Sequence, residues 1–342
     1  MEIHCYTSFS FSYLAKARTL AASVKRYHPD WRLWAVISDR EPAGFRFDIQ
    51  NEDFDFVIWG DELFGAETLH WMFKHDVVEL CTAVKGPVLK RIVETTNADR
   101  IFYLDPDIAV FGSLQPLVDM LETSSILLTP HQLDPDESRF AIADNEICSL
   151  RLGIYNLGFV AIRTDGEGYR FARWWSDRLR DYCFDEPSGG LFVDQKWCDL
   201  VPAFFENVKI VRDPGCNVAS WNLSKRKVTI DQSGNILVNG SPLRFFHFTK
   251  LGPIGDVMTQ RYAQDNVEVY ELWTWYRHMV KQFEEPAIPG RWWKYSQFSN
   301  GSPISRDARI LYRHRIDLQN AFPDPFDADG DSYYSWLQTN TP

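Results

Sequence analysis

Residues 100–111 decide the fold, and they read Arg-Ile-Phe-Tyr-Leu-Asp-Pro-Asp-Ile-Ala-Val-Phe. The apolar run 101–104 is typical of a buried strand, and two carboxylates, Asp105 and Asp107, follow it directly. Alternate residues of an extended chain point to the same side, and Pro106 places the pair at the end of the strand. Two carboxylates this close favour a hard divalent cation between them. An ordinary strand-to-turn exit rich in Asp is the alternative.

Composition limits the possible partners. The chain has 342 residues, of which 45% are hydrophobic and 24% charged, which is typical of one or two globular domains. The net charge of −11 argues against nucleic acid as a partner, although a local metal or cluster of cations can still bind a phosphorylated small molecule. The cysteines are scattered, which predicts free thiols in a reducing compartment. With no visible signal peptide and no apolar run long enough for a bilayer, we expect a cytoplasmic protein.

Strand-like and helix-like segments alternate in the first half of the chain. The strands are expected at 2–7, 33–38, 54–59, 101–104, 125–129, 155–162 and 208–211, and the helices at 14–27, 74–96 with a break at 86–87, 166–182 and 192–205. This alternation predicts a mostly parallel sheet with crossover helices, in which ligands bind beyond the carboxyl ends of the strands. Thr7, Asp39, Asp105 and Asp107 all lie at such ends, which favours a nucleotide site. The polar segment 131–149 is expected to be a loop near that site.

The second half has a different pattern. Turn signals separate 227–230, 236–238 and 243–248, which predicts a small antiparallel ribbon. The rest is helical and rich in Trp, with helices expected at 270–283 and 304–318 and a frayed final dozen residues. We therefore expect an α/β domain at 1–255 and a helical extension at 256–342. The four arginines of 304–318 indicate either a solvated face packed on the core or contact with an anionic membrane surface. Residues 327–331 resemble a calcium loop, but Gln338 stands where its last carboxylate would be.

Several motifs together resemble one family, the nucleotide-sugar glycosyltransferases of GT-A fold, and within it the glycogenin-like group and related bacterial polysaccharide glycosyltransferases. Residues 103–108 are similar to its Asp-x-Asp motif, 155–159 to its Asn-x-Gly strand, Asp194-Gln195 to its Asp-Gln pair, and His247-Phe248 to its late metal-binding strand. The order and spacing agree over about residues 1–250. The stretches 79–85 and 322–326 also resemble bacterial polysaccharide transferases. The resemblance implies a GT-A, Rossmann-like sheet flanked by helices.

The resemblance also implies a role for each matching residue. Asp105, Asp107 and His247 would bind Mn²⁺ or Mg²⁺, and the imidazole favours manganese. Thr7, Asp39, Lys85, Asp105, Asn156, Gly158 and Lys250 would bind the donor. Asp194 and Gln195 would act at the transferred sugar, with Asp194 as the base if the reaction inverts. Strand-end capping for Thr7 and Asp39, a solvated Lys85, a helix-capping Asp194 and a core His247 are the structural alternatives.

The implied function is metal-dependent transfer of a sugar from a nucleotide diphosphate to a saccharide or lipid-linked glycan, with retention of configuration, in cell-surface polysaccharide biosynthesis. Peripheral contact with the inner membrane surface is compatible with it. Two alternatives remain open. A sugar nucleotidyltransferase would use similar carboxylates, but residues 8–10 are not a Gly-rich phosphate loop. A non-catalytic carbohydrate-binding protein would keep the aromatic residues without needing the two aspartates.

Overall fold

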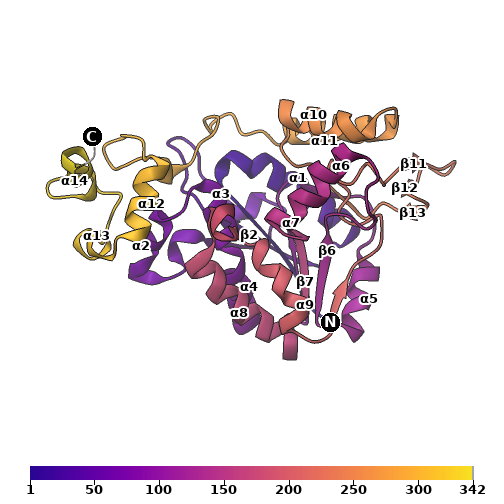
Figure 1. Ribbon diagram of the computed structural model, residues 1–342, viewed down its shortest axis with the longest axis horizontal. Coiled ribbons are helices and arrows are strands. Elements are labelled where there is room, and N and C mark those ends of the chain that lie inside the picture. The colour runs from indigo at the N-terminus through magenta and orange to yellow at the C-terminus, as the bar shows by residue number, and fades with distance from the viewer. Residues whose placement is uncertain (341–342) are drawn as a thin grey trace.

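The computed structural model describes residues 1–340, and a seven-stranded sheet forms its centre (Figure 1). The strands follow the order β10-β6-β7-β4-β1-β2-β3. Their bounds are β1 Ile3–Phe9, β2 Arg32–Ile37, β3 Phe56–Trp59, β4 Arg100–Leu104, β6 Ile126–Pro130, β7 Tyr155–Arg163 and β10 Val208–Ile210. Only β7 runs antiparallel to its neighbours within this sheet. The mostly parallel α/β sheet expected from the sequence is confirmed, and it agrees with the GT-A fold class.

Helices cover both faces of the sheet (Figure 1). One face packs on α4 Lys85–Thr95 and α8 Gly166–Tyr182, and the other on α1 Leu14–Tyr27 and α5 Gln115–Thr123. Neighbouring strand residues alternate between the two cores, as Phe102 and Tyr103 do. The α4–α8 contact requires Gly86, because a Cβ there would lie 2.9 Å from the backbone of Ser176. The sheet is therefore the middle layer between two layers of helices.

A second, two-stranded sheet completes the site edge. After β4 the chain turns through Asp105–Asp107 into β5 Ile108–Val110, which pairs antiparallel with β14 Phe245–His247. In this register His247 lies opposite Ile108. The small ribbon comprises β11 Val228–Ile230, β12 Ile236–Val238 and β13 Ser241–Pro242. The ribbon is thus confirmed, but the prediction that 243–248 belongs to it is wrong, since β14 leaves it for β5.

Three local expectations in the first 205 residues are wrong in whole or in part. The expected loop 131–149 is largely helical, with α6 Arg139–Ala141, a π-helix Ile142–Ile147 and α7 Cys148–Leu152, because the Ser138 hydroxyl caps the start by accepting from Ala141 N–H at 3.1 Å. The expected helix 192–205 is helical only from residue 196, as a 3₁₀ helix Lys196–Leu200 followed by α9 Val201–Phe204. Its expected first turn is instead strand β9 Leu191–Phe192, which pairs with β8 Asp185–Glu186 in a short hairpin. The helical stretch before β4 breaks at Val84, between α3 Val77–Ala83 and α4, since Pro87 fits within a first turn. A short helix, α2 Thr68–Phe73, precedes them.

The helical C-terminal part is confirmed, and α10 Pro253–Ala263, α11 Val267–Gln282, α12 Arg306–His314, α13 Ile316–Ala321 and α14 Tyr333–Asn340 form it. The last three make a lobe at the left of Figure 1. The expected helix 304–318 breaks at the extended residue Arg315. The expectation of a frayed end is wrong for the described residues, because α14 buries Tyr333 fully; residues 341–342 lie outside the described part. The division of the chain at residue 255 stays a prediction.

Two arginines of α12 point into the protein. Arg309 donates to the carbonyls of Phe73 and His75 at 3.1 and 2.9 Å, and Arg313 pairs with the buried Glu79 at 2.8 Å. These contacts support the interpretation of α12 as a helix packed on the core. Within residues 1–340, none of the helices combines the length and the apolar character that crossing a bilayer demands. All six cysteines are free.

Candidate active site

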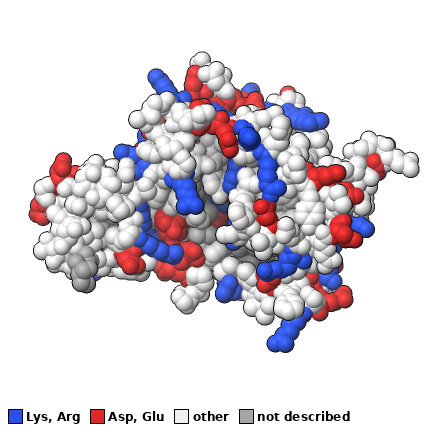
Figure 2. Space-filling model, turned by 90° about the horizontal axis from the view of Figure 1, so that it is seen from above, with Lys and Arg blue, Asp and Glu red and all other residues white. Residues whose placement is uncertain are grey.

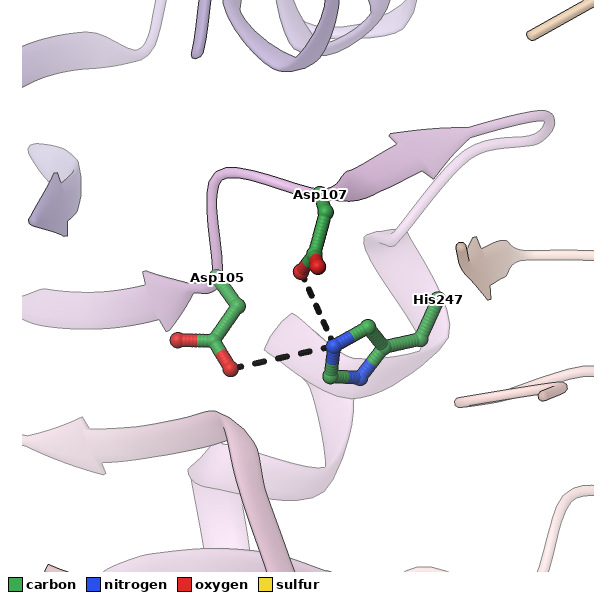
Figure 3. A group of neighbouring side chains, drawn as sticks. All are labelled: Asp105, Asp107 and His247. Atoms are coloured by element: carbon green, nitrogen blue, oxygen red, sulfur yellow. Dashed lines mark ion pairs between the residues drawn. The ribbon is translucent and has the colours of Figure 1, made fainter. Parts of the chain in front are cut away.

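Asp105, Asp107 and His247 meet at the carboxyl end of β4 (Figure 3). The His247 Nε2 lies 3.0 Å from Asp107 Oδ1 and 3.8 Å from Asp105 Oδ2. One ligand atom from each residue lies within 4.8 Å of the others. Asp107 and His247 are buried, whereas Asp105 is about one-quarter exposed at 24% of its side chain. The structure thus brings together the three residues that the sequence analysis predicted as metal ligands.

The imidazole of His247 is held in one orientation. Its Nδ1 lies 3.2 Å from Asn156 Oδ1, which also accepts from Gly158 N–H at 3.2 Å and from the Asn217 amide at 3.0 Å. Because Oδ1 is an acceptor, Nδ1 carries the proton and the Nε2 faces the carboxylates. A histidine that binds a metal is oriented by such a hydrogen bond to its other nitrogen.

Gly158 makes this arrangement possible. A Cβ at residue 158 would lie 2.5 Å from His247 Cε1, 2.7 Å from His247 Nδ1 and 2.8 Å from Asn156 Oδ1. No side chain fits in that space, so the backbone of β7 can approach the ring only with glycine. Gly158 of the predicted Asn-x-Gly strand therefore leaves the space that the His247 ring and the Asn156 amide occupy.

The ion pair between His247 and Asp107 balances charge within the cluster. Burial alone would lower the pKa of His247, but the carboxylates of Asp107 and Asp105 raise it above its ordinary value. Burial would likewise raise the pKa of Asp107, and the charge of His247 holds it below its ordinary value. A divalent cation would replace the imidazolium proton in that role. Two carboxylates and one imidazole fit such an ion, and the imidazole suits manganese better than magnesium.

Lys85 links the cluster to Asp194. Its Nζ lies 3.1 Å from Asp105 Oδ1 and 2.8 Å from Asp194 Oδ2, and it donates to the Leu157 carbonyl at 3.1 Å. The side chain is buried, so the alternative of a solvated lysine is wrong. Burial would lower the pKa of Lys85, but the two carboxylates raise it above its ordinary value. Tyr103 donates to the same Asp105 oxygen at 2.6 Å.

Asp194 and Gln195 follow β9 and lie beside this network. Burial raises the pKa of Asp194 above its ordinary value, against the lowering effect of Lys85. Gln195 donates to the Leu152 carbonyl at 3.0 Å, and its Oε1 lies 3.5 Å from the Asn156 amide nitrogen. The capping alternative for Asp194 is wrong, because the N-cap of the following 3₁₀ helix is Gln195 and the Asp194 carboxylate pairs with Lys85 instead.

A cavity of about 410 Å³ opens next to Asn156 and Gln195. Trp221, Lys250 and Met258 also line this cavity. Lys250 is exposed and has no ion pair with any residue from 1 to 340, so it is a free cation at this cavity. The face seen from above is hollowed near its middle, and both basic and acidic side chains border the hollow (Figure 2).

Asp39 follows the end of β2, but Thr7 lies within the neighbouring strand β1 and not at its end, because the pairing of β1 with β2 continues to Phe9. The Thr7 hydroxyl is buried and has no hydrogen-bond partner among the described residues. The Asp39 carboxylate accepts from the backbone N–H groups of Phe11, Arg40 and Lys294 at 3.0, 2.8 and 2.7 Å. Burial raises its pKa to about 7 despite these bonds. Asp39 thus joins three segments of the chain, and donor binding by it or by Thr7 stays a prediction.

Sequence reasoning missed two residues of the site. Asn217 orients Asn156, and Trp221 meets the His247 ring edge-on at 5.2 Å between centroids. Both lie in the irregular segment before β11, which carries no motif or periodicity. A bridge from Val218 to Phe246 brings that segment to the site, and no local signal in the sequence reports it.

Comparisons with known proteins give remote similarities. No protein-family model matches the chain. The Bacillus subtilis protein YfnF is 29% identical over 175 residues, which cover 51% of this chain and 57% of YfnF. YfnD of the same organism is 24% identical over 249 residues, which cover 72% of this chain and 77% of YfnD. Both are described as uncharacterized, and the match spans little more than half the length of YfnF.

Several solved structures that resemble this chain remotely carry glycosyltransferase names. The galactosyltransferase LgtC, in complex with donor and acceptor sugar analogs, matches with a TM-score of 0.48 at 15% identity, covering 85% of this chain and 98% of LgtC. The glycosyltransferase GlyE of Streptococcus pneumoniae matches with a TM-score of 0.42 at 16% identity, covering 84% of this chain and 65% of GlyE. Mouse xyloside xylosyltransferase 1 gives a TM-score of 0.41 at 15% identity, covering 74% of this chain and 99% of that one.

Proposed function

We propose that this chain is a metal-dependent GT-A glycosyltransferase that moves a sugar from a nucleotide-diphosphate donor to a saccharide acceptor. One observation carries the proposal: two aspartates and an oriented histidine converge at the carboxyl end of a central strand. Ligands of such sheets bind at that edge. The galactosyltransferase named above was solved with donor and acceptor sugar analogs, which agrees with this class of substrates.

Asp105, Asp107 and His247 would hold Mn²⁺ or Mg²⁺. The bound ion would neutralise the charge that develops on the departing diphosphate. Lys85 fixes Asp105 and Asp194 relative to each other through its two ion pairs. The unpaired Lys250 would bind a phosphate oxygen across the cavity.

The transferred sugar would lie against Asn156, Gln195 and Asp194. Buried amide and carboxylate groups discriminate between sugars because a missing hydroxyl leaves them unpaired. We propose retention of configuration, with the departing phosphate taking the acceptor proton. Asp194 would serve as base only in an inverting reaction, which its ion pair with Lys85 disfavours. A role in cell-surface polysaccharide biosynthesis within the cytoplasm belongs to the same proposal.

The test incubates the protein with a panel of nucleotide sugars, with and without Mn²⁺, and measures release of nucleoside diphosphate. We expect release with at least one donor, lost in Asp107→Asn and kept in Asp177→Asn, an exposed aspartate outside the site. Pyrophosphate release from a nucleoside triphosphate would instead indicate a nucleotidyltransferase. Sugar binding that ignores both nucleotide and metal would indicate a carbohydrate-binding protein.

A further inference from the structure

Lys16 lies in the first turn of α1, and its side chain is partly buried. Its Nζ lies over the ring of Tyr13, 3.5 Å from the ring centroid. With the residues from 1 to 340, this Nζ forms neither an ion pair nor a hydrogen bond. Taking an ammonium group partly out of water costs free energy unless an anion compensates for the lost water. Lys16 therefore lacks the partner that a partly buried lysine needs.

The order of strands places the start of α1 at the same edge of the sheet as the metal cluster. β1 and β4 are parallel neighbours, so α1, which follows β1, begins at the carboxyl edge where the turn after β4 lies. Near the end of β1, Ser8 Oγ lies 3.1 Å from the hydroxyl of Tyr103, and that hydroxyl donates to Asp105. The first turn of α1 therefore follows directly on residues that contact the cluster.

Packing brings this turn toward Asp107 in particular. Ala15, next to Lys16 in the chain, packs against the apolar group that contains Phe248. The N–H of Phe248 donates to the Asp107 carbonyl at 2.8 Å. Burial lowers the pKa of Lys16 below its ordinary value, and the negative charge of Asp107 opposes that shift. Lys16 is thus an electrostatic neighbour of the metal cluster, although no ion pair between described residues joins it to Asp107.

The charges of the site leave a diphosphate in need of such a cation. The two carboxylates of the cluster and that of Asp194 would be balanced by a bound divalent ion together with Lys85. A nucleotide-sugar donor adds the negative charge of its phosphates, which has to meet cations outside this set. Lys250 is one cation without an ion pair in the described part of the chain, and Lys16 is a second.

We propose that Lys16 binds a phosphate oxygen of the donor, in addition to the contact assigned to Lys250. The assignment rests on the proposed function, because it requires a diphosphate at the metal cluster. In the absence of donor, the ring of Tyr13 holds the ammonium group through a cation–π contact. A phosphate oxygen can replace this contact, because hydrogen bonds between two charged groups are stronger.

A cation in this place has opposite effects on the two ligands of the site, since it repels a bare divalent ion and attracts a diphosphate. Lys16→Met removes the charge and keeps an unbranched side chain. The full chain with this substitution should bind Mn²⁺ alone about two- to tenfold more tightly than the wild type. In saturating Mn²⁺, its affinity for nucleoside diphosphates should fall about 10–100-fold. Calorimetric titration measures both affinities, with UDP, GDP, CDP, ADP and dTDP as the probes.

Two further variants show whether the charge at this position is responsible. Lys16→Arg keeps a cation on α1 and should retain most of the affinity for the diphosphate. Arg26→Met is the matched control, because Arg26 is an exposed cation near the other end of α1 and lies 5.8 Å from the centroid of its own neighbouring ring, Tyr27. This control should leave the affinities for Mn²⁺ and for the diphosphate unchanged.

The direction of the two shifts separates a binding role from a structural one. Equal diphosphate affinity in the wild type and in Lys16→Met overturns the assignment of Lys16 and leaves the proposed function standing. Weaker binding of both Mn²⁺ and diphosphate also overturns the assignment, because a general disturbance of the site lowers both affinities. A wild type that binds none of the probes in the presence of Mn²⁺ overturns the proposed function and the assignment together.

Discussion

Replacing Gly158 with alanine tests the geometry of the metal cluster directly. The added Cβ would lie 2.5 Å from His247 Cε1 and 2.8 Å from Asn156 Oδ1, so the ring and the amide have to move. The ring would then lose the hydrogen bond that orients it for a metal. Loss of such an orienting contact lowers metal affinity about 10–100-fold, which corresponds to about 1.4–2.7 kcal/mol. Overpacking of this kind also lowers the free energy of unfolding by about 1–3 kcal/mol.

Calorimetric titration of the purified protein with Mn²⁺ measures the loss of metal affinity without any assay of turnover. Gly290→Ala is the matched control, because a Cβ at residue 290 meets nothing within 4 Å. Urea unfolding of each variant shows whether the fold persists at the temperature of the titration. Wild-type affinity in a folded Gly158→Ala protein would refute the idea that His247 binds the ion in the orientation seen here.

Two further predictions concern buried charge. Lys85→Met leaves Asp105 and Asp194 without their shared cation, so the free energy of unfolding from urea titrations should fall by about 3–5 kcal/mol. Adding Asp194→Asn to this variant should restore part of the lost free energy. A loss below about 1 kcal/mol in Lys85→Met would contradict the reasoning. Burial, together with the charge of Arg313, lowers the pKa of His75 to about 3. The neutral His75 therefore contributes fully to the free energy of unfolding above pH 6.5, and this contribution is lost as the pH falls toward 3, at about 1.4 kcal/mol per pH unit. His75→Phe should therefore weaken the dependence of urea unfolding on pH between 6.5 and 4, and an unchanged slope would show that His75 is not held neutral.

The sequence predicts best what local chemistry determines. The run 101–104 and the two aspartates after it define β4 and its carboxyl end. The apolar run favours a buried strand, and Pro106 cannot continue the pairing of that strand, so the strand has to end there. The sheet's parallel character follows from the alternation of strands and helices. The hairpin at β8–β9 and the helical 139–152 segment escape prediction, since a short turn that ends at Gly190 with φ 82° and a capping Ser138 decide them.

Long-range pairing decides the rest of the site. In the sequence, His247 stands out only because His247-Phe248 resembles a family motif. The pattern of residues 243–248 alone predicts a strand of the small ribbon. It becomes a candidate metal ligand because β14 pairs with β5, the strand that directly follows Asp107. That pairing places three residues of β14 opposite three residues of β5 that lie 135 to 139 positions away in the sequence, as in His247 and Ile108. No local propensity encodes this pairing.

The same pairing explains why the cluster can be both rigid and open. His247 lies on β14, and Asp107 directly precedes β5, the strand that pairs with β14. Phe248 N–H donates to the Asp107 carbonyl at 2.8 Å, so the backbone fixes the separation of Asp107 and His247. Asp105 belongs to the turn outside that ladder and is held by side chains, Lys85 and Tyr103. An incoming cation would therefore meet two ligands fixed by backbone pairing and one that can adjust, which suits an ion whose remaining positions are filled by substrate oxygens. A cluster with all three ligands on one ladder could not make that adjustment.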